Sequence, residues 1–553
     1  ANGFAVNTVS AAGQTVTLNG GTGAITDNNL LLNNITASVL DASAATGIAL
    51  DTIISFLSFN NSGAGGVTIS NTVGAGNTLT LAGTDGGGAI NITETTTGTG
   101  HITVGTVGTQ MGITGGAGVI NLTTTDGAIT TGGAGEGMSS TNGVITLTAN
   151  VTPAVSTILG DITVGAGGIN SGSGNIFLYA ADSVILNGAV TATGIGDVTV
   201  EANSDNAVDF SATDTLGSIS GAGKVSGDAV TLKATQGISA NTAATTLIAS
   251  NAPHVGGGSA SGNISITEDD NVTLAGVSNS ASGGTIGITT TNGDLNTGTL
   301  AVSSTNGAIT LNANDTDATP TSDATLTVGS GGVSAGNQLI QLLSDDHIVV
   351  SGSVTTTDNV TATADNDAGD GTADTVGAIS GAGLISGNLL TLSASQGIAA
   401  SIAATTLDAQ NTGASGNVVI AEADAITVMA LSNAVADDND GTTGQVSLVT
   451  TNGGITVDVT GTGVTAVDGN ITLDANGTDS DLTVNQVVQT TNPTVGGVVS
   501  ITLSADDSIA FGVSGDVTGT GDVTVGVTAN ANASNGDGAD DIVMDTGTVI
   551  NAG

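Results

Sequence analysis

The sequence contains no Cys, no Trp and no Arg, and only two Lys stand against 48 acidic residues. Without Cys, disulfides and thiolate metal sites are excluded. A chain with so few cations cannot neutralise phosphates, which excludes nucleic-acid binding, and an anionic membrane surface repels it. No apolar stretch is long enough to cross a bilayer, so we expect no membrane insertion. The formal net charge of −46 makes cations the natural partners.

Aromatic residues are almost as rare, with six Phe and one Tyr in 553 residues. Globular cores are usually filled by aromatic residues and Leu, because these bury the most apolar area per residue. Here the apolar residues are mostly Val, Ile and Ala, accompanied by Thr and by 87 Gly. Val, Ile and Thr favour extended backbone, whereas Gly, Asn and Asp favour turns. The composition therefore predicts an all-β chain with a narrow interior.

One long stretch occurs twice. Residues Asp214–Asn251 read DTLGSISGAGKVSGDAVTLKATQGISANTAATTLIASN, and Asp374–Asn411, 160 positions later, read DTVGAISGAGLISGNLLTLSASQGIAASIAATTLDAQN. Roughly two-thirds of the aligned positions are identical without a gap, which indicates a tandem repeat. A repeat of this length, built from small residues, favours an extending scaffold over a globule that encloses a reaction.

Shorter phrases recur in the same order in each copy. INITE (Ile90–Glu94), ISITE (Ile264–Glu268) and VVIAE (Val418–Glu422) match, and Gly47-Ile48 echoes the Gly-Ile pair of the later copies, with Asn60 near the place of their Asn. We interpret the chain as about three and a half copies of a unit near 160 residues. The predicted copies are residues 1–160, 161–324, 325–480 and a partial copy, 481–553.

The first copy is the most apolar one. Phe56 and Phe59 stand where the later copies have small or polar residues. This difference predicts that the first copy either packs against something else or forms a capping region of the repeat array.

Short runs of Thr, Val and Ile, separated by Asn-Gly, Asp-Gly or Gly-Gly, are typical of strands and turns. Two architectures fit them: an elongated β-solenoid, in other words a parallel β-helix, and a string of β-sandwich domains. Sandwich cores are about 10 Å thick and need bulky inward residues, which this chain lacks. In a solenoid, like residues stack on like, so Val, Ile, Ala and Thr fill the interior. We therefore predict the solenoid, with tandem sandwiches as the alternative.

The phrases GNISIT (Gly262–Thr267), GAITLNAN (Gly307–Asn314) and GNITLDAN (Gly469–Asn476) resemble the passenger repeats of filamentous-haemagglutinin-type adhesins and related β-strand-repeat bacterial surface proteins. The resemblance covers nearly the whole chain as a texture of repeats. It implies a right-handed parallel β-helix that is exported to the cell surface for adhesion, aggregation or filament building. The NPNG-like secretion motif of the two-partner-secreted members is absent.

Residues that could support catalysis are few. His101, His254 and His347 have no His equivalents in the other copies, which argues against a repeated His-based site. Acidic pairs could act as acid and base in polysaccharide cleavage, as on β-helical lyases and hydrolases, but those families also place Arg, Lys or His beside the acids. We interpret the pairs as solvated turn residues and expect no enzyme activity. The pairs are Asp269-Asp270, Asp345-Asp346, Asp506-Asp507 and Asp540-Asp541.

Calcium is the one ligand that the acidic turns favour. Hard cations bind several oxygen atoms from Asp, Asn and backbone carbonyls on a turn. Neither the EF-hand spacing nor the calcium-binding nonapeptide of RTX proteins is present. The candidate ligands of the two leading turns are Asp365, Asp367 and Asp370 in DNDAGDG, and Asp537, Asp540 and Asp541 in DGADD. A third acidic turn, DANGTDSD, contains Asp474, Asn476, Asp479 and Asp481.

These observations predict a non-enzymatic, extracellular structural repeat protein, a segment of a surface fibre, adhesin or filament. Expected partners are further copies of the chain, cations, and a cell-surface receptor or glycan. We expect end-to-end contact through terminal coils, because open solenoid ends are strand edges. An S-layer or sheath subunit with cation-dependent assembly is the second hypothesis, and a polysaccharide-acting β-helix enzyme is the third.

Overall fold

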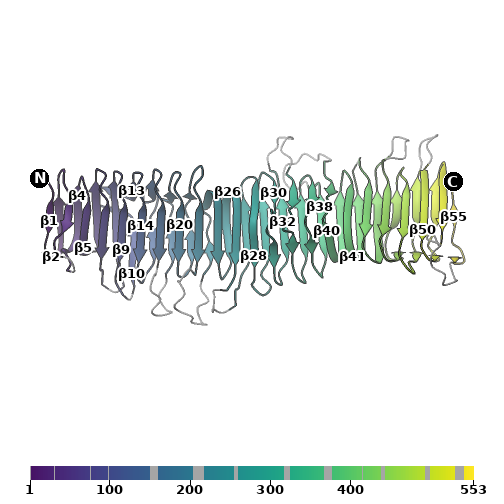
Figure 1. The fold of residues 1–553 in the computed structure, drawn as a ribbon, viewed down its shortest axis with the longest axis horizontal. Coiled ribbons are helices and arrows are strands. Elements are labelled where there is room, and N and C mark those ends of the chain that lie inside the picture. Colours follow the sequence, from purple (N-terminus) through teal and green to yellow (C-terminus); the bar gives the residue numbers. More distant parts are fainter. Residues whose placement is uncertain are drawn as a thin grey trace. The chain divides into compact units, whose positions relative to one another are not determined.

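The computed structural model of the protein describes residues 2–29, 32–74, 76–97, 99–149, 160–203, 217–253, 259–316, 324–366, 376–413, 415–436, 443–491, 499–529 and 541–552. These residues form strands and no helix (Figure 1). The chain divides into two units: residues 1–269 with 278–285, and residues 270–277 with 286–553. The prediction of an all-β chain is confirmed for the described residues.

Strands in each unit pair in parallel with strands one coil earlier and one coil later. In the first unit, Ile120 of β14 (Ile120–Thr124) pairs with Ile90 of β9 (Ile90–Glu94) and with Ile145 of β17 (Ile145–Ala149). In the second unit, β44 (Val446–Thr450) lies in the same way between β42 (Val418–Glu422) and β47 (Ile471–Ala475). Parallel pairing from coil to coil defines a parallel β-solenoid. The solenoid prediction is confirmed, and the sandwich alternative is wrong.

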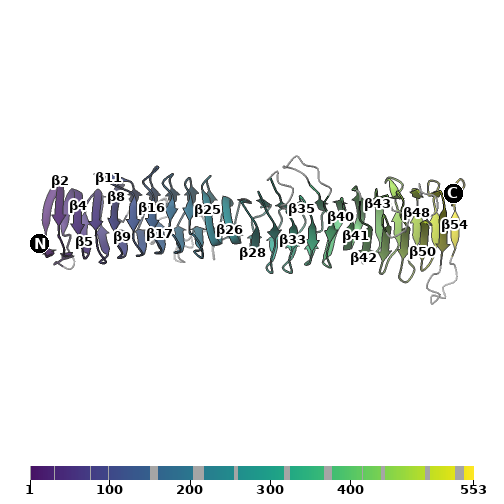
Figure 2. The same cartoon turned by 90° about the horizontal axis from the view of Figure 1, so that it is seen from above.

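Most coils of the first unit contribute three short strands, which stack in three columns (Figures 1 and 2). The first column contains β5 (Ile48–Ile53), β7 (Val67–Asn71), β9, β14, β17, β20 (Ile176–Ala180) and β23 (Val198–Ala202). The second contains β10 (Gly100–Val104), β15 (Ile129–Thr131), β18 (Ile162–Val164), β21 (Val184–Leu186) and β24 (Ile219–Ser220). The third contains β13 (Ile113–Gly115), β16 (Met138–Ser140), β19 (Ile169–Asn170) and β22 (Val190–Thr191). Other short strands of this unit are β1 (Phe4–Val6), β3 (Ile25–Asp27), β11 (Thr106–Val107), β12 (Gln110–Met111) and β27 (Ile264–Glu268).

The second unit repeats this plan. In its earlier coils the first column contains β29 (Ile286–Thr290), β32 (Ile309–Ala313), β35 (Ile340–Ser344) and β38 (Val360–Ala364). The second column contains β30 (Leu295–Asn296), β33 (Leu326–Val328), β36 (Ile348–Val350) and β39 (Ile379–Ser380). The third column contains β31 (Val302–Ser304), β34 (Val333–Ser334) and β37 (Val354–Thr355). In its later coils the first column contains β42, β44, β47, β50 (Val499–Ala505) and β53 (Val523–Thr528). The second column contains β45 (Ile455–Val457), β48 (Leu482–Val484), β51 (Ile509–Phe511) and β54 (Ile542–Met544). The third column contains β46 (Gly463–Ala466), β49 (Val488–Thr491), β52 (Val517–Thr520) and β55 (Ile550–Asn551).

Long strands replace the short ones at intervals and form broad flat surfaces. The duplicated sequence folds into these strands: β25 (Lys224–Ala234) and β40 (Leu384–Ala394) have 11 residues each, and β26 (Ile238–Asn251) and β41 (Ile398–Asn411) have 14 each. In the first copy the corresponding region contains β2 (Val9–Asn19), β4 (Ile35–Ala44), β6 (Phe56–Asn61) and β8 (Asn77–Asp85), and later β28 (Val272–Asn279) and β43 (Ile426–Asn433) are also extended.

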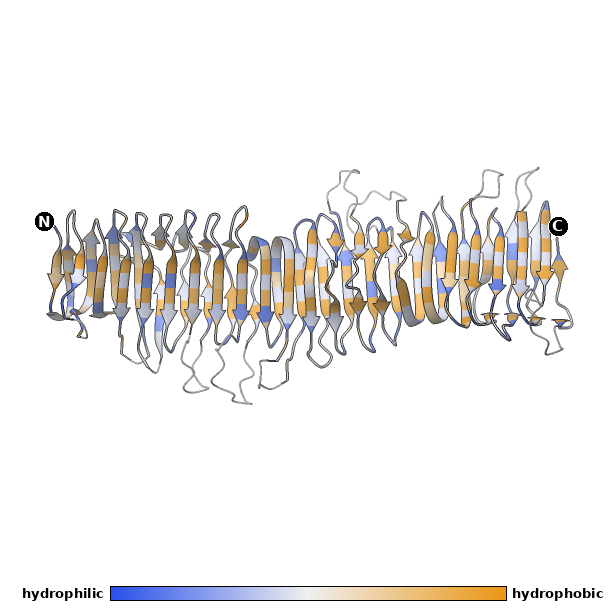
Figure 3. Cartoon of the chain, viewed as in Figure 1, coloured by the Kyte–Doolittle hydropathy of each residue, from blue (hydrophilic) through white to orange (hydrophobic). Residues whose placement is uncertain are grey.

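Alternate side chains point into each coil, as the period of a strand requires. In β14, β17 and β20 the first, third and fifth residues are buried and the two between them are partly exposed. Figure 3 shows the same alternation as bands of colour along the strands. Like residues stack on like: Ile120, Ile145, Ile176 and Val198 follow one another in register. The interior is therefore filled by β-branched and Leu side chains, as the composition predicts.

Buried Asn residues explain the repeated Gly-Ile pair. The side-chain oxygens of Asn61, Asn251 and Asn411 accept the backbone N–H of Gly47, Gly237 and Gly397 at 3.0, 2.9 and 3.0 Å. Each Asn is almost fully buried, so its hydrogen bonds are made inside the coil. The marker residue of the first copy is thus Asn61 and not its neighbour Asn60, which is exposed.

The first copy contains a coil that the third copy lacks. Sequence matching aligns Ile48 with Ile398 and Ile90 with Val418. In the structure Ile398 stacks directly on Val418, whereas β7 lies between Ile48 and Ile90. The copies therefore differ by a whole coil, and the predicted copy boundaries remain a prediction.

Phe59 is accommodated in the narrow interior by a glycine in the next coil. Phe59 is fully buried and pairs in register with Gly83 of β8. A Cβ atom at Gly83 would lie 2.5 Å from ring atom Cγ of Phe59 and 2.5 Å from its backbone oxygen. In the third copy the small and the large residue are exchanged: Ala409 takes the place of Phe59, and its partner Leu431 takes the place of Gly83.

This exchange predicts a compensating pair of substitutions. Gly83→Leu alone should overpack the coil and destabilise it by about 1–3 kcal/mol, and Phe59→Ala alone should leave a cavity that costs about 3–5 kcal/mol. The double variant removes the contact with the ring but leaves the contact between a Cβ atom at residue 83 and the backbone oxygen of residue 59, so it should recover part of the loss. Denaturant unfolding, combined with hydrogen exchange of residues 56–61 and 77–85, measures the coupling. Additive losses in the double variant would contradict the size-exchange explanation.

Candidate binding groove

Of the six predicted calcium ligands in the two leading turns, the structure describes one from each turn, Asp365 and Asp541. Asp365 follows β38 with a φ of 68°, and Asp541 immediately precedes β54, several coils further along the second unit. Asp367, Asp370, Asp537 and Asp540 lie outside the described residues. Within the described ranges, no three His, Asp or Glu residues gather in a way that could hold a metal ion.

The third acidic turn lines a shallow depression of about 420 Å³, to which Asp479 and Asp481 contribute. The carboxylate of Asp481 accepts the backbone N–H of Ser508 at 3.1 Å, and that of Asp474 accepts the side-chain amide of Asn476 at 3.1 Å. The Asp481 carboxylate therefore links neighbouring coils, and the Asp474 carboxylate stabilises its own turn.

Three of the acidic pairs directly follow strands, as predicted, but the description as solvated residues is wrong for one member of each of two pairs. Asp346 after β35 and Asp506 after β50 are only 5% and 6% exposed. The carboxylate of Asp506 accepts the backbone N–H of Gly477 at 2.9 Å. A turn acid of this kind is buried because it bonds the backbone of an adjacent coil.

The described histidines have the same structural role. Nδ1 of His101 accepts the N–H of Ala128 at 3.0 Å, and Nδ1 of His347 accepts the N–H of Ala378 at 3.1 Å. Asn263 and Asn417 make equivalent bonds to the N–H groups of the following coils. His254 lies outside the described residues.

Three buried glutamates form a further set: Glu94, Glu268 and Glu422, the last residues of the three matched phrases. Each carboxylate accepts backbone N–H groups at a corner of its coil, at 3.0–3.1 Å. The donors are Val73 and Thr96 for Glu94, Ala244 and Asp269 for Glu268, and Ala404 and Asp424 for Glu422. Their oxygens therefore hold the backbone, and this explains why the phrases end in Glu.

Glu422 lacks the side-chain donor that the other two have. Asn71 donates to Glu94 and Thr242 donates to Glu268, each at 2.7 Å, whereas Ile402 pairs with Glu422. Burial raises the pKa of Glu422 to about 6, partly offset by its backbone hydrogen bonds. Burial disfavours the charged form of a carboxyl group that has too few donors.

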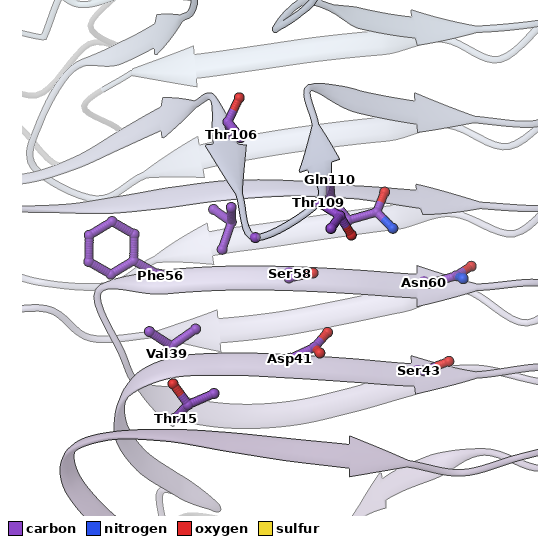
Figure 4. A pocket seen from close by; sticks show the side chains of 12 residues that line it. Thr15, Val39, Asp41, Ser43, Phe56, Ser58, Asn60, Thr106, Thr109 and Gln110 are labelled. Carbon is purple, nitrogen blue, oxygen red and sulfur yellow. The ribbon is translucent and has the colours of Figure 1, made fainter.

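A groove of about 700 Å³ crosses the outer surface of the first unit (Figure 4). Its floor consists of outward side chains of β2, β4 and β6, which lie in register across the strands. We define three rows: the Phe56 row (Thr15, Val39, Phe56), the Asp41 row (Thr17, Asp41, Ser58) and the Asn60 row (Asn19, Ser43, Asn60). Continuous long strands make this floor flat.

A hairpin forms the wall of the groove. Its strands β11 (Thr106–Val107) and β12 (Gln110–Met111) pair antiparallel, unlike every other named strand pair in the described chain. The hairpin contacts β6 and β8. Beneath it the outward residues Ala82 and Ser58 are buried, and Val107 is only 5% exposed. Val107 therefore anchors the hairpin on the outer surface of the coil.

Glu136 ties the hairpin to the following coil. The hydroxyl of Thr106 donates to its carboxylate at 2.6 Å, and the N–H of Gly133 donates at 2.9 Å. These two hydrogen bonds lower the pKa of Glu136. The hairpin is thus held from below by Val107 and from the side by Glu136.

Among the groove residues, the sequence distinguishes Phe56 as an exchange between copies and Asn60 only as a repeat marker. Phe56 corresponds to Thr246 and Thr406 in the later copies and is 41% exposed. The other lining residues are Thr, Ser, Asn and Asp of a kind found throughout the chain, so only their arrangement distinguishes them.

No protein-family model matches the chain, and neither a curated protein sequence nor a solved structure matches it. In the part of the chain that the structure describes, no helix is long and apolar enough to cross a bilayer. The adhesin-like repeat texture remains an expectation from sequence.

The raised pKa of Glu422 predicts that the stability of the folded state depends on pH. Because its folded pKa lies above the ordinary value of 4.5, the folded state binds the proton more tightly than the unfolded state. The stability of its coil should be highest below pH 4.5 and fall by about 2 kcal/mol in total as the pH rises through 6. Ile402→Thr supplies the missing donor and Glu422→Gln removes the charge. Both should reduce this fall in pH-dependent denaturant unfolding, and an unchanged pH profile in both would contradict the assignment.

The hydrogen bond from Thr106 to Glu136 predicts that Glu136 restrains the hairpin. Glu136→Ala removes the acceptor for Thr106 and should accelerate hydrogen exchange in residues 105–112 several-fold at neutral pH, with little change elsewhere. Glu201→Ala, which removes another acid of this unit, 3.6 Å from Lys233, is the matched control. Equal exchange in wild type and Glu136→Ala would show that Val107 alone holds the hairpin.

Proposed function

We propose that the chain is a non-enzymatic structural segment of an extracellular surface fibre, adhesin or filament. The observation that carries this proposal is that the coil interiors are filled by apolar ladders and by Asn and Glu side chains that bond the backbone. Such an interior uses its polar groups for the scaffold and leaves the outer surface for contacts. The repeat texture of surface adhesins agrees with this assignment.

The strand edge formed by β54 and β55 is the contact surface considered for association. Among the described strands, β54 pairs with β51 and β55 pairs with β52. Ile542 and Met544 continue the inward positions of Ile509 and Phe511, yet they are 49% and 45% exposed. Exposed edges with apolar side chains are templates for pairing with another chain. In the proposed fibre a further coil, of the same polypeptide or of another copy, covers this edge.

A lattice subunit of an S-layer or sheath is the second candidate, supported by the acidic composition, since cations would have to bridge neighbouring molecules. A polysaccharide-acting enzyme has less support. Glycoside hydrolysis commonly needs two carboxyl groups on either side of the bond, and the groove is lined by one, Asp41.

The proposal predicts concentration-dependent end-to-end association that persists in a chelator. Ile542→Glu places a charge on the exposed inward position and should weaken association at least about tenfold, by adding repulsion to an already acidic chain. Val543→Glu, at the adjacent outward position, is the matched control. Light scattering and electron microscopy, with calcium and with chelator, measure the outcome. Sheets that dissolve in chelator would favour the lattice, and particles that stay monomeric at all concentrations would contradict self-association.

A further inference from the structure

We infer that the groove bounded by the β11–β12 hairpin binds a neutral carbohydrate chain. This inference deepens the proposed adhesive function and rests on it, because it names the class of partner that the surface would contact. The groove volume of about 700 Å³ lies within the range of ordinary ligand sites. Four features of the lining support this class of ligand: its rows, its aromatic ring, its charge and its wall.

The three rows present alternating chemistry at regular intervals. Residues two apart on one strand are separated by about 6.6 Å, and neighbouring strands by about 4.8 Å. The Phe56 row is apolar at Val39 and Phe56, whereas the Asn60 row offers an amide and the hydroxyl of Ser43. A sugar ring has apolar C–H faces and a rim of hydroxyl groups, so it can contact both rows at once.

Phe56 supplies the apolar surface. Its side chain lies at one end of the hairpin, beside Val39 (Figure 4), and is 41% exposed. The later copies show that the strand forms equally well with Thr at this position, since Thr406 pairs in the same long-strand arrangement. Folding therefore does not require the ring. A half-exposed ring that folding does not require is available for contact with a ligand.

The charge of the lining selects among carbohydrates. Asp41 is its one charged residue, and no Lys or His is present among the lining residues. Sialylated, uronic or sulfated chains would meet this carboxylate within an acidic protein and would be repelled. Thr, Ser, Asn and Gln side chains donate and accept hydrogen bonds without charge, which fits neutral hydroxyl groups.

The hairpin makes the groove a prepared site. Gln110 and Thr109 project from it on the side of Asn60 (Figure 4). Because Val107 and Glu136 hold the hairpin in place, little ordering is required when a ligand binds.

A peptide is a poorer occupant. An added strand needs an open edge with free backbone groups. The floor strand β4 is paired on both sides, with β2 and with β6, and β6 is paired with β4 and β8. Between the hairpin and β4 the groove therefore offers side chains, and the one backbone edge of its floor among the described strands is the outer edge of β2, away from the hairpin.

The test compares Phe56→Thr with Phe177→Thr. The first variant installs the residue of the later copies, so folding should be preserved. The second removes an outward ring from β20, where it stacks on Tyr179 with ring centroids 6.0 Å apart, away from the groove lining. The full chain is applied to a printed array of neutral, sialylated and sulfated oligosaccharides. Calorimetry then measures the affinity for a retained neutral oligosaccharide.

We expect neutral oligosaccharides to be retained by wild type and by Phe177→Thr, and bound at least about tenfold more weakly by Phe56→Thr. Equal binding by wild type and Phe56→Thr, retention of anionic glycans only, or no retention at all would overturn the inference. The association test with Ile542→Glu is independent of the groove. Failure on the array together with normal association therefore rejects the carbohydrate site alone, whereas failure of association alone rejects the fibre.

Discussion

Parallel backbone pairing between successive coils is the constraint on which the rest of each unit depends. Once strands lie in register one coil apart, every inward side chain rests on the residue at the same position of the next coil. Side chains that stack well on themselves are then favoured: Ile, Val and Leu in apolar columns, and Asn where a backbone N–H turns inward. The composition, poor in aromatic residues and rich in β-branched ones, follows from this rule.

Departures from like-on-like stacking are therefore paired. Phe59 requires Gly83, and Ala409 permits Leu431, because the two coils share one layer of interior volume. Glu268 is matched by the hydroxyl of Thr242, whereas Glu422 faces Ile402 and keeps its proton to a higher pH. In each case the partner one coil away, and not the sequence neighbour, decides whether a residue is tolerated.

Much of the fold could be predicted from the sequence because the repeat reveals the stacking rule directly. Short Thr, Val and Ile runs between Gly turns identified the strands, and the lack of large core residues favoured a solenoid over sandwiches. The extra coil at β7 could not be predicted, since VTISN resembles every other strand and the repeat phrases align across it. The buried positions of Asp346 and Asp506 were missed because their hydrogen-bond partners lie in another coil. In the sequence, the only sign of the groove is Phe56, which stands where the later copies have Thr. The other groove residues are of types common throughout the chain.

The extra coil and the hairpin of the first copy are two different ways to add residues to a repeat. A complete coil enters the stack, so it lengthens the column by one strand spacing and leaves the pairing above and below unchanged. The hairpin enters at a corner, so it adds nothing to the length and instead raises the outer surface at one place. Insertions that complete a turn thus alter the reach of such a scaffold, whereas those that do not complete one alter what its surface can hold. Segments gained by this chain can be sorted by that criterion alone.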